Sequence, residues 1–105
     1  MEIAQFQAAV EAWIAEHGGY WTPPENLGRL IEEVGEIARH VNAQAGRKAL
    51  APDAEPVSGE IGDALFVLAA LAAQLGTSLP EAAQAVLRKQ GGRGEVAGKL
   101  PREAK

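Results

Sequence analysis

The hydrophobic positions of this chain recur at helical spacing in four separate stretches, which predicts an all-α fold. A first helix is expected over residues 2–16, ending before Gly18-Gly19, with its core face made by Ile3, Phe6, Val10, Trp13 and Ile14. A second helix is expected after Pro23-Pro24, because Thr22 and Glu25 have the spacing of a capping box. Its apolar stripe comprises Leu27, Leu30, Ile31, Val34, Ile37 and Val41.

A more apolar helix follows in the second half of the chain. Residues 46–57 break the periodicity and contain two prolines, so they predict a loop. Ser58 is expected to cap the third helix. Because Asp63 is the only charged residue in the stretch 61–75, this helix is expected to be the central and most buried one.

A fourth helix completes the predicted fold. Ser78 and Glu81 have capping-box spacing at its start, and Gly91-Gly92 is expected to end it. With 105 residues the chain has room for one domain. We therefore expect a helical domain over residues 1–92 and a basic, flexible C-terminal tail over residues 93–105.

Composition narrows the possible functions. The absence of cysteine excludes disulfides, thiolate zinc sites and cysteine nucleophiles, and suits a reducing cytoplasm. The N-terminus has no basic targeting region and the apolar run 64–73 is too short to cross a bilayer, so no membrane partner is expected. Residues 1–87 hold 12 acidic and 4 basic side chains, which argues against duplex nucleic acid as the main ligand. So small a domain buries little surface, which favours self-association.

Two pairs of carboxylates are the main candidate site. Glu33 and Glu36 are three residues apart on a helix, as are Glu60 and Asp63, so each pair projects from one helical face. Two carboxylates about 5 Å apart repel by roughly 3 kcal/mol at an effective dielectric near 20, which a cation would offset. Oxygen ligands favour Mg²⁺, with Mn²⁺ as a substitute. Di-iron sites are disfavoured because they use Glu-x-x-His, whereas His40 follows Glu36 by four residues.

A simpler interpretation applies to part of this set. The acidic residues of the second helix are equally well explained as a solvated helix face. Glu60, in the first turn of the third helix, can serve the helix dipole alone. Asp63 is less easily explained in this way, because it shares a side with Val67 and Ala70, where burial is expected.

The acidic residues also carry a family resemblance. Two strings resemble the EExxE and ExxD signature of MazG-like, all-α nucleoside triphosphate pyrophosphohydrolases. The first is Glu32-Glu33-Val34-Gly35-Glu36-Ile37. The second, separated from Glu36 by 23 residues, is Glu60-Ile61-Gly62-Asp63-Ala64-Leu65-Phe66. The resemblance extends over roughly residues 3–90. It implies a four-helix protomer whose homodimers complete a helical bundle and often pair into homotetramers.

The resemblance also implies the chemistry. Members hydrolyse a nucleoside triphosphate to the monophosphate and pyrophosphate with magnesium, in many cases to clean the nucleotide pool. Matched by position, Glu33, Glu36, Glu60 and Asp63 correspond to the metal-binding carboxylates, and Glu32 to a neighbouring acidic position. Water would attack the α-phosphorus, and Glu33 is our first choice for the residue that orients or deprotonates it. Two alternatives stay open: an enzyme similar to phosphoribosyl-ATP pyrophosphohydrolase, and a non-catalytic helical oligomer that binds a nucleotide or a partner.

The C-terminal region departs from the family pattern. Members often continue a helix with a Lys-, Asn- and Arg-bearing stretch that helps to hold phosphates. Here the corresponding basic residues are Arg88, Lys89 and Arg93, no Asn is present, and Gly91-Gly92 interrupts the stretch. These side chains are either phosphate contacts or a solvated basic end.

Aromatic residues near the first loop are candidates for binding the base. Trp21 and His17 lie between the first two helices, where an aromatic ring either stacks on a nucleobase or anchors the loop. Trp13 is expected in the core. His40 is expected to be a solvated histidine near the end of the second helix.

Overall fold

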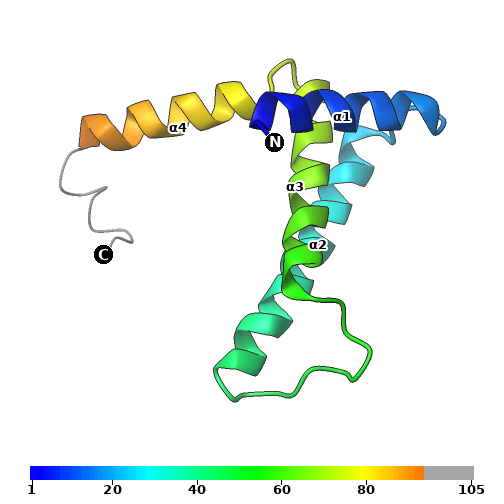
Figure 1. Cartoon of the computed structure of the whole chain (residues 1–105), viewed down its shortest axis with the longest axis vertical. Coiled ribbons are helices and arrows are strands. Elements are labelled where there is room, and N and C mark those ends of the chain that lie inside the picture. Colours follow the sequence, from blue (N-terminus) through cyan, green and yellow to red (C-terminus); the bar gives the residue numbers. More distant parts are fainter. Residues whose placement is uncertain (94–105) are drawn as a thin grey trace.

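The structure, a computed structural model, describes residues 1–93, and the side chains of residues 92 and 93 lie outside this description. The four helices are α1 (Ile3–Glu16), α2 (Pro23–Gln44), α3 (Val57–Gln74) and α4 (Leu79–Arg93). No strand occurs among these residues, which confirms the all-α prediction. In Figure 1, α2 and α3 run side by side as a hairpin that projects from the top of the molecule, where α1 and α4 extend in opposite directions.

Two of the predicted helix boundaries form as local sequence dictates. At the start of α2, Glu25 N–H donates to Thr22 Oγ1 (3.3 Å) and Thr22 N–H donates to Glu25 Oε1 (2.9 Å), which completes the capping box. After α1, Gly18 and Gly19 have φ values of 101° and 91°. Only glycine adopts such angles without strain, so the pair ends the helix as predicted.

Two other boundaries differ from the prediction. Ser58 does not cap α3, because the helix already begins at Val57 and Pro56 occupies the N-cap position with extended backbone. Gly91-Gly92 does not end α4, which continues to Arg93. Each glycine lowers helix propensity by about 1 kcal/mol, but neither adopts the left-handed backbone conformation that ends α1.

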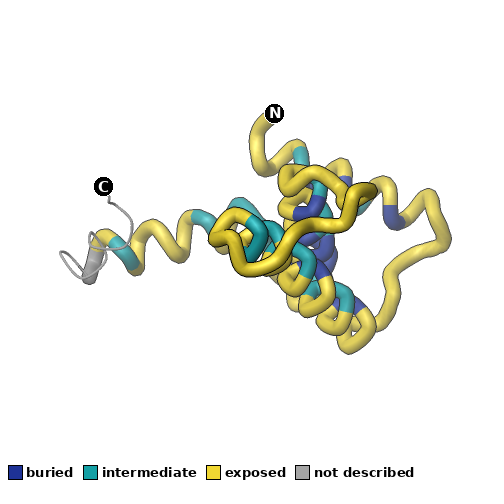
Figure 2. The backbone as a smooth tube through the Cα atoms, turned by 90° about the horizontal axis from the view of Figure 1, so that it is seen from below, coloured by how far each residue is buried: buried dark blue, intermediate teal, exposed yellow. Residues whose placement is uncertain are grey.

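The core lies where α1 crosses the C-terminal half of α3. Val10 and Ile14 of α1 pack there against Ala69 and Ala70 of α3. The small alanine side chains let the two helices approach closely. In Figure 2 the buried residues lie among α1, α2 and α3, while the extended part of α4 is mostly exposed.

A buried glutamine ties three helices together at the core. Gln7 Nε2 donates to the carbonyl oxygen of Ala69 in α3 at 3.0 Å. Gln7 Oε1 accepts a hydrogen bond from the N–H of Leu79, the first residue of α4, at 2.9 Å. The side chain of Gln7 therefore helps to set how α4 leaves the core.

The helix α2 buries only part of its apolar stripe. The buried residues of this helix are Asn26 and Glu33, and they are polar. Leu30 and Ile37 of the stripe are partly buried, and its exposed members are Leu27 (52%), Ile31 (65%), Val34 (55%) and Val41 (59%). Most of the stripe is therefore exposed in the protomer, because a carboxylate-bearing side of α2 occupies the contact with α3.

The helix α3 is the most buried of the four, as predicted. Its buried residues are Glu60, Ala64, Val67, Ala69, Ala70 and Ala72. One side of it is nevertheless exposed and apolar, at Ile61, Leu65 and Leu68. Over its full 18 residues α3 is long and apolar enough to span a bilayer by length and composition alone, unlike the shorter run considered above. It contacts all three other helices, as the central helix of the fold does.

Candidate functional site

The two carboxylate pairs lie at the contact between α2 and α3. Glu33 of α2 and Glu60 of α3 are 8% and 7% exposed, and Glu36 and Asp63 are partly buried. The pKa of Glu33 is raised above its ordinary value, first by burial and then by the negative charges of Glu36 and Asp63. The helical hairpin therefore brings the four carboxylates into one acidic centre, Glu33, Glu36, Glu60 and Asp63.

Two oxygens of this acidic centre are buried and poorly satisfied. Glu33 Oε1 has no hydrogen-bond partner, and Glu60 Oε1 accepts no hydrogen bond of good geometry, although His40 Nε2 lies 3.0 Å away. A buried carboxylate oxygen without a partner costs free energy, because it has lost its hydration and gained nothing in return. A hard divalent cation that accepts oxygen ligands would satisfy both atoms. The donor set therefore fits magnesium.

The arrangement indicates how such a cation would be held. Among residues 1–93, no three Asp, Glu, His or Cys side chains converge closely enough to hold one metal ion. Mg²⁺ commonly takes one or two carboxylates and completes its octahedral shell with water and phosphate oxygens. Each pair of carboxylates is therefore suited to hold an ion together with its substrate.

His40 contacts the acidic centre, contrary to the expectation of a solvated histidine. Its Nε2 atom lies 3.0 Å from Glu60 Oε1 and 3.0 Å from the backbone oxygen of Glu55. The side chain is only 15% exposed. His40 therefore connects Glu55, at the end of the long loop, to Glu60.

Glu55 brings a fifth carboxylate to the same region. Charge repulsion from Asp63 is the largest cause of its raised pKa, followed by burial and then by Glu60 and Glu36. Its carboxylate lies against Gly59, where a Cβ atom would collide with it. Glu55 is twenty-two residues from Glu33 along the chain, and no sequence pattern identified it.

An aromatic pocket lies near the N-terminal end of α2. This cavity of about 160 Å³ is lined by both tryptophans and by His17, Tyr20, Arg29 and Phe66, among others. The Trp13 ring stacks on His17 with 3.9 Å between ring centroids and meets the edge of Phe66 at 5.6 Å. Trp13 is half exposed, so the expectation that it lies in the core is wrong. Trp21 and His17 both line this pocket.

Arg29 connects the aromatic pocket to the acidic centre. Its guanidinium lies over the Trp21 ring, 5.0 Å from the centroid, which is within the range of a cation–π interaction. Its Nη2 atom is 3.9 Å from Glu33 Oε2. Sequence reasoning did not single out Arg29, although its spacing of four residues from Glu33 was visible.

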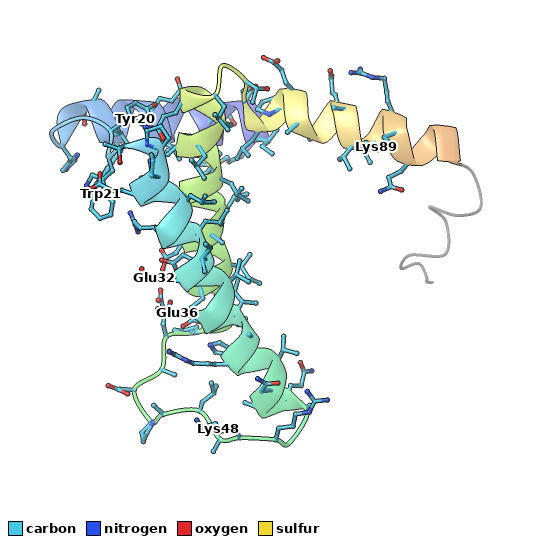
Figure 3. The ribbon with its side chains drawn as sticks, turned by 180° about the vertical axis from the view of Figure 1, so that it is seen from behind. Tyr20, Trp21, Glu32, Glu36, Lys48 and Lys89 are labelled. Atoms are coloured by element: carbon cyan, nitrogen blue, oxygen red, sulfur yellow. The ribbon has the colours of Figure 1, made fainter. Side chains whose placement is uncertain are left out.

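A second, larger cavity of about 830 Å³ lies beside the second half of α2, under the loop of residues 45–56. Glu36 and Glu60 line it on the side of the acidic centre. Arg39 and His40 of α2 and Lys48 of the loop also line it. In Figure 3, Glu36 and Lys48 are labelled on α2 and on the loop, respectively.

The remaining predicted residues lie apart from the acidic centre. Arg88 and Lys89 are exposed on α4, which makes no contact with α2 among the described residues. Figure 3 shows Lys89 far from Glu32 and Glu36. The side chain of Arg93 and the tail 94–105 lie outside the described residues. Glu32 is exposed on α2 and lines a shallow hollow with Trp21 and Arg29.

Comparisons with known proteins agree with this geometry. The model of the MazG nucleotide pyrophosphohydrolase domain matches residues 21–96. The uncharacterized protein YpjD of Bacillus subtilis (strain 168) is 43% identical over 90 residues, which cover 83% of this chain and 81% of YpjD. The crystal structure of YpjD superposes with a TM-score of 0.73 at 39% identity, covering 85% of this chain and 94% of that chain. The Bacillus-conserved MazG protein, a nucleotide pyrophosphohydrolase, gives a TM-score of 0.71 at 33% identity, covering 85% and 88% of the two chains.

Proposed function

Because the chain belongs to the MazG nucleotide pyrophosphohydrolase family, we propose that it hydrolyses nucleoside or deoxynucleoside triphosphates to the monophosphate and pyrophosphate, with magnesium. The observation that carries this proposal is the pair of buried carboxylate oxygens on Glu33 and Glu60, neither of which accepts a hydrogen bond of good geometry. The proposed role is removal of unwanted nucleotides from the cytoplasmic pool.

The acidic centre supplies the groups for the reaction. Glu33 and Glu36 would hold one ion and Glu60 and Asp63 another; when bound, magnesium neutralises phosphate charge and acidifies a coordinated water. Glu33 is the candidate base, because its burial favours the protonated form and so makes the carboxylate a better proton acceptor. The attacking water forms a bond to the α-phosphorus, the bond to the bridging oxygen breaks, and pyrophosphate leaves with the electron pair of that bond.

The aromatic pocket is the proposed site for the base. Its volume of about 160 Å³ is smaller than a typical ligand pocket of roughly 300–1,000 Å³, so it suits one part of the substrate. Trp21 and His17 present ring faces on which a base can stack. His17 Nδ1 lies 2.7 Å from the backbone oxygen of Trp13, which holds its ring in place.

We also propose that the protein is a homodimer or a homotetramer. The exposed apolar residues of α2, with Ile61, Leu65 and Leu68 of α3, support this proposal, since a soluble helix rarely leaves such a stripe in water. Arg88 and Lys89 would reach a phosphate only from a neighbouring subunit, because α4 points away from the acidic centre of its own protomer.

The test is a panel of ribo- and deoxyribonucleoside triphosphates and phosphoribosyl-ATP, assayed for pyrophosphate release with Mg²⁺, with Mn²⁺ and with a chelator. We expect metal-dependent turnover of at least one nucleoside triphosphate. Glu60→Gln should lower kcat at least about 100-fold, because one ligand of the ion is lost. Glu16→Gln, at the exposed end of α1, is the matched control and should retain activity.

Each contrary outcome points to a different function. Turnover restricted to phosphoribosyl-ATP would indicate the biosynthetic enzyme. Nucleotide binding by calorimetry without turnover of any compound would indicate a non-catalytic binding protein. If every compound is inert and Glu60→Gln behaves as the unmodified protein does, the proposed function is refuted.

A further inference from the structure

The cavity of about 830 Å³ has a defined place relative to the rest of the site. The aromatic pocket is lined from α2 by Asn26 and Arg29, and the larger cavity is lined from α2 by Glu36, Arg39, His40 and Asn42. Because a helix rises 1.5 Å per residue, Arg29 and Arg39 are about 15 Å apart along its axis. The acidic centre therefore lies between an aromatic pocket at one end and this cavity at the other.

The chemistry of the cavity differs from that of the aromatic pocket. Among the residues that the structure describes, no Phe, Tyr or Trp side chain lines it. Arg39 and Lys48 offer two positive charges, and Asn42 and His40 offer further hydrogen-bonding groups. Its volume lies within the range of roughly 300–1,000 Å³ typical of ligand pockets. These features suit a polyanion.

We propose that this cavity is the subsite for the two terminal phosphates of the substrate, and for the pyrophosphate product, with Lys48 and Arg39 as their charged contacts. A nucleoside triphosphate has an aromatic base at one end and its terminal phosphates at the other. Placed along α2, it matches the order of aromatic pocket, acidic centre and basic cavity. The identity of the nucleotide rests on the proposed function, whereas the binding of pyrophosphate does not.

The charge balance of the cavity makes this binding depend on metal. Glu36, Glu60, Asp53 and Glu55 also line it, so carboxylates outnumber the two cations. A polyanion is repelled while all four are uncompensated. Divalent cations on Glu36 and Glu60 would neutralise the carboxylates next to the acidic centre, and Arg39 and Lys48 would then complete the binding. Pyrophosphate should consequently bind only together with Mg²⁺.

The loop that carries Lys48 is attached at both ends. Where it leaves α2, Arg47 N–H donates to the backbone oxygen of Asn42 at 2.9 Å. Before it enters α3, the backbone oxygen of Glu55 lies 3.0 Å from His40 Nε2. Lys48 is therefore presented to the cavity by a segment with fixed ends, and its long side chain can reach a phosphate.

The experiment measures binding of inorganic pyrophosphate by calorimetry, with and without Mg²⁺, so it needs neither a nucleotide nor turnover. Lys48→Met should weaken binding roughly 10- to 100-fold, the usual effect of losing a charge-assisted hydrogen bond. Arg39→Met should act in the same direction, and Lys48→Arg should restore most of the affinity. Arg47→Met is the matched control, since it removes the same charge from the neighbouring residue, which does not line the cavity.

The proposal is overturned if Lys48→Met and Arg39→Met bind magnesium pyrophosphate as the unmodified protein does, or if the unmodified protein binds none at millimolar concentration. An equal loss of pyrophosphate affinity in Arg47→Met also overturns it, because the effect would then come from the change in net charge and not from a contact in the cavity. These results are independent of the proposed function. A protein that hydrolyses no triphosphate can still bind pyrophosphate through Lys48, and a protein that hydrolyses triphosphates can still bind pyrophosphate elsewhere.

Discussion

Glu33 combines burial with charge in a way that limits the stability of the metal-free protein. Its carboxylate is almost fully covered, and its basic neighbour Arg29 is 3.9 Å away. Burial raises its pKa above the ordinary value of 4.5, with Glu36 and Asp63 adding to the effect. The folded state therefore binds its proton more tightly than the unfolded state does. The contribution of Glu33 to the free energy of unfolding therefore falls as the pH rises from 4.5 through its raised pKa in the folded state.

This leads to a prediction for Glu33→Gln. In the presence of a chelator at pH 7, the variant should melt at a higher temperature than the unmodified protein, and its stability should fall less as the pH rises from 5 to 7. Mg²⁺ should no longer stabilise it fully, and kcat should drop about 100- to 10,000-fold if Glu33 is the base. Thermal unfolding across pH, beside Glu16→Gln, provides the check. Lower stability of the variant at pH 7 would contradict the argument.

The four helices follow from local sequence more closely than their ends do. Periodic apolar positions predicted each helix, and the Thr22–Glu25 capping box formed because both partners lie within one turn. The ends of the helices are less predictable: Gly18-Gly19 ends α1, whereas Gly91-Gly92 lies within α4. After α1, Gly19 N–H bonds the backbone oxygen of Ile14 at 2.9 Å. Nothing in the two dipeptides distinguishes these outcomes, so the surrounding chain decides them.

At the scale of the elements, Gln7 offers a test of how α1, α3 and α4 are joined. Gln7→Met keeps the side-chain volume and removes the bonds to Ala69 and Leu79. We expect a loss of about 1–3 kcal/mol in the free energy of unfolding, because buried backbone groups are left unpaired. Chemical denaturation measures this change in the free energy of unfolding. Gln44→Met, at the exposed end of α2, should change stability by less than about 0.5 kcal/mol. Equal effects of the two substitutions would show that the hydrogen bonds of Gln7 to Ala69 and Leu79 contribute nothing to stability.

At the scale of the whole molecule, most of the apolar stripe of α2 is left exposed by the residues that the structure describes. Figures 1 and 2 show a hairpin of α2 and α3 that is open on its outer sides. Ile31, at 65% exposure, lies in the middle of this stripe. Burial of such a side chain against a second subunit is worth roughly 1.5–3 kcal/mol, and a twofold axis doubles the contribution.

Ile31→Lys should therefore convert the proposed oligomer to monomers, which light scattering after size-exclusion chromatography would detect. Pyrophosphate release should fall with it if a neighbouring subunit contributes to the site. Ala12→Lys, which adds the same charge on the exposed side of α1, should leave the mass unchanged. If the unmodified protein is monomeric at micromolar concentration, the proposed assembly is refuted.

The helices, the family and the two carboxylate pairs could be predicted from the sequence, because helix formation, capping and the spacing of Glu33/Glu36 and Glu60/Asp63 depend on residues within one or two turns. What covers each face of a helix depends instead on contacts between residues far apart in the chain. Periodicity shows that residues share a side of α2 but not whether α3 or water lies against it, so the exposure of Ile31 was missed. The positions of Lys48, Glu55 and His40 depend on the path of the long loop, which contacts distant in sequence determine. For the same reason, the cavity beside the acidic centre could not be predicted.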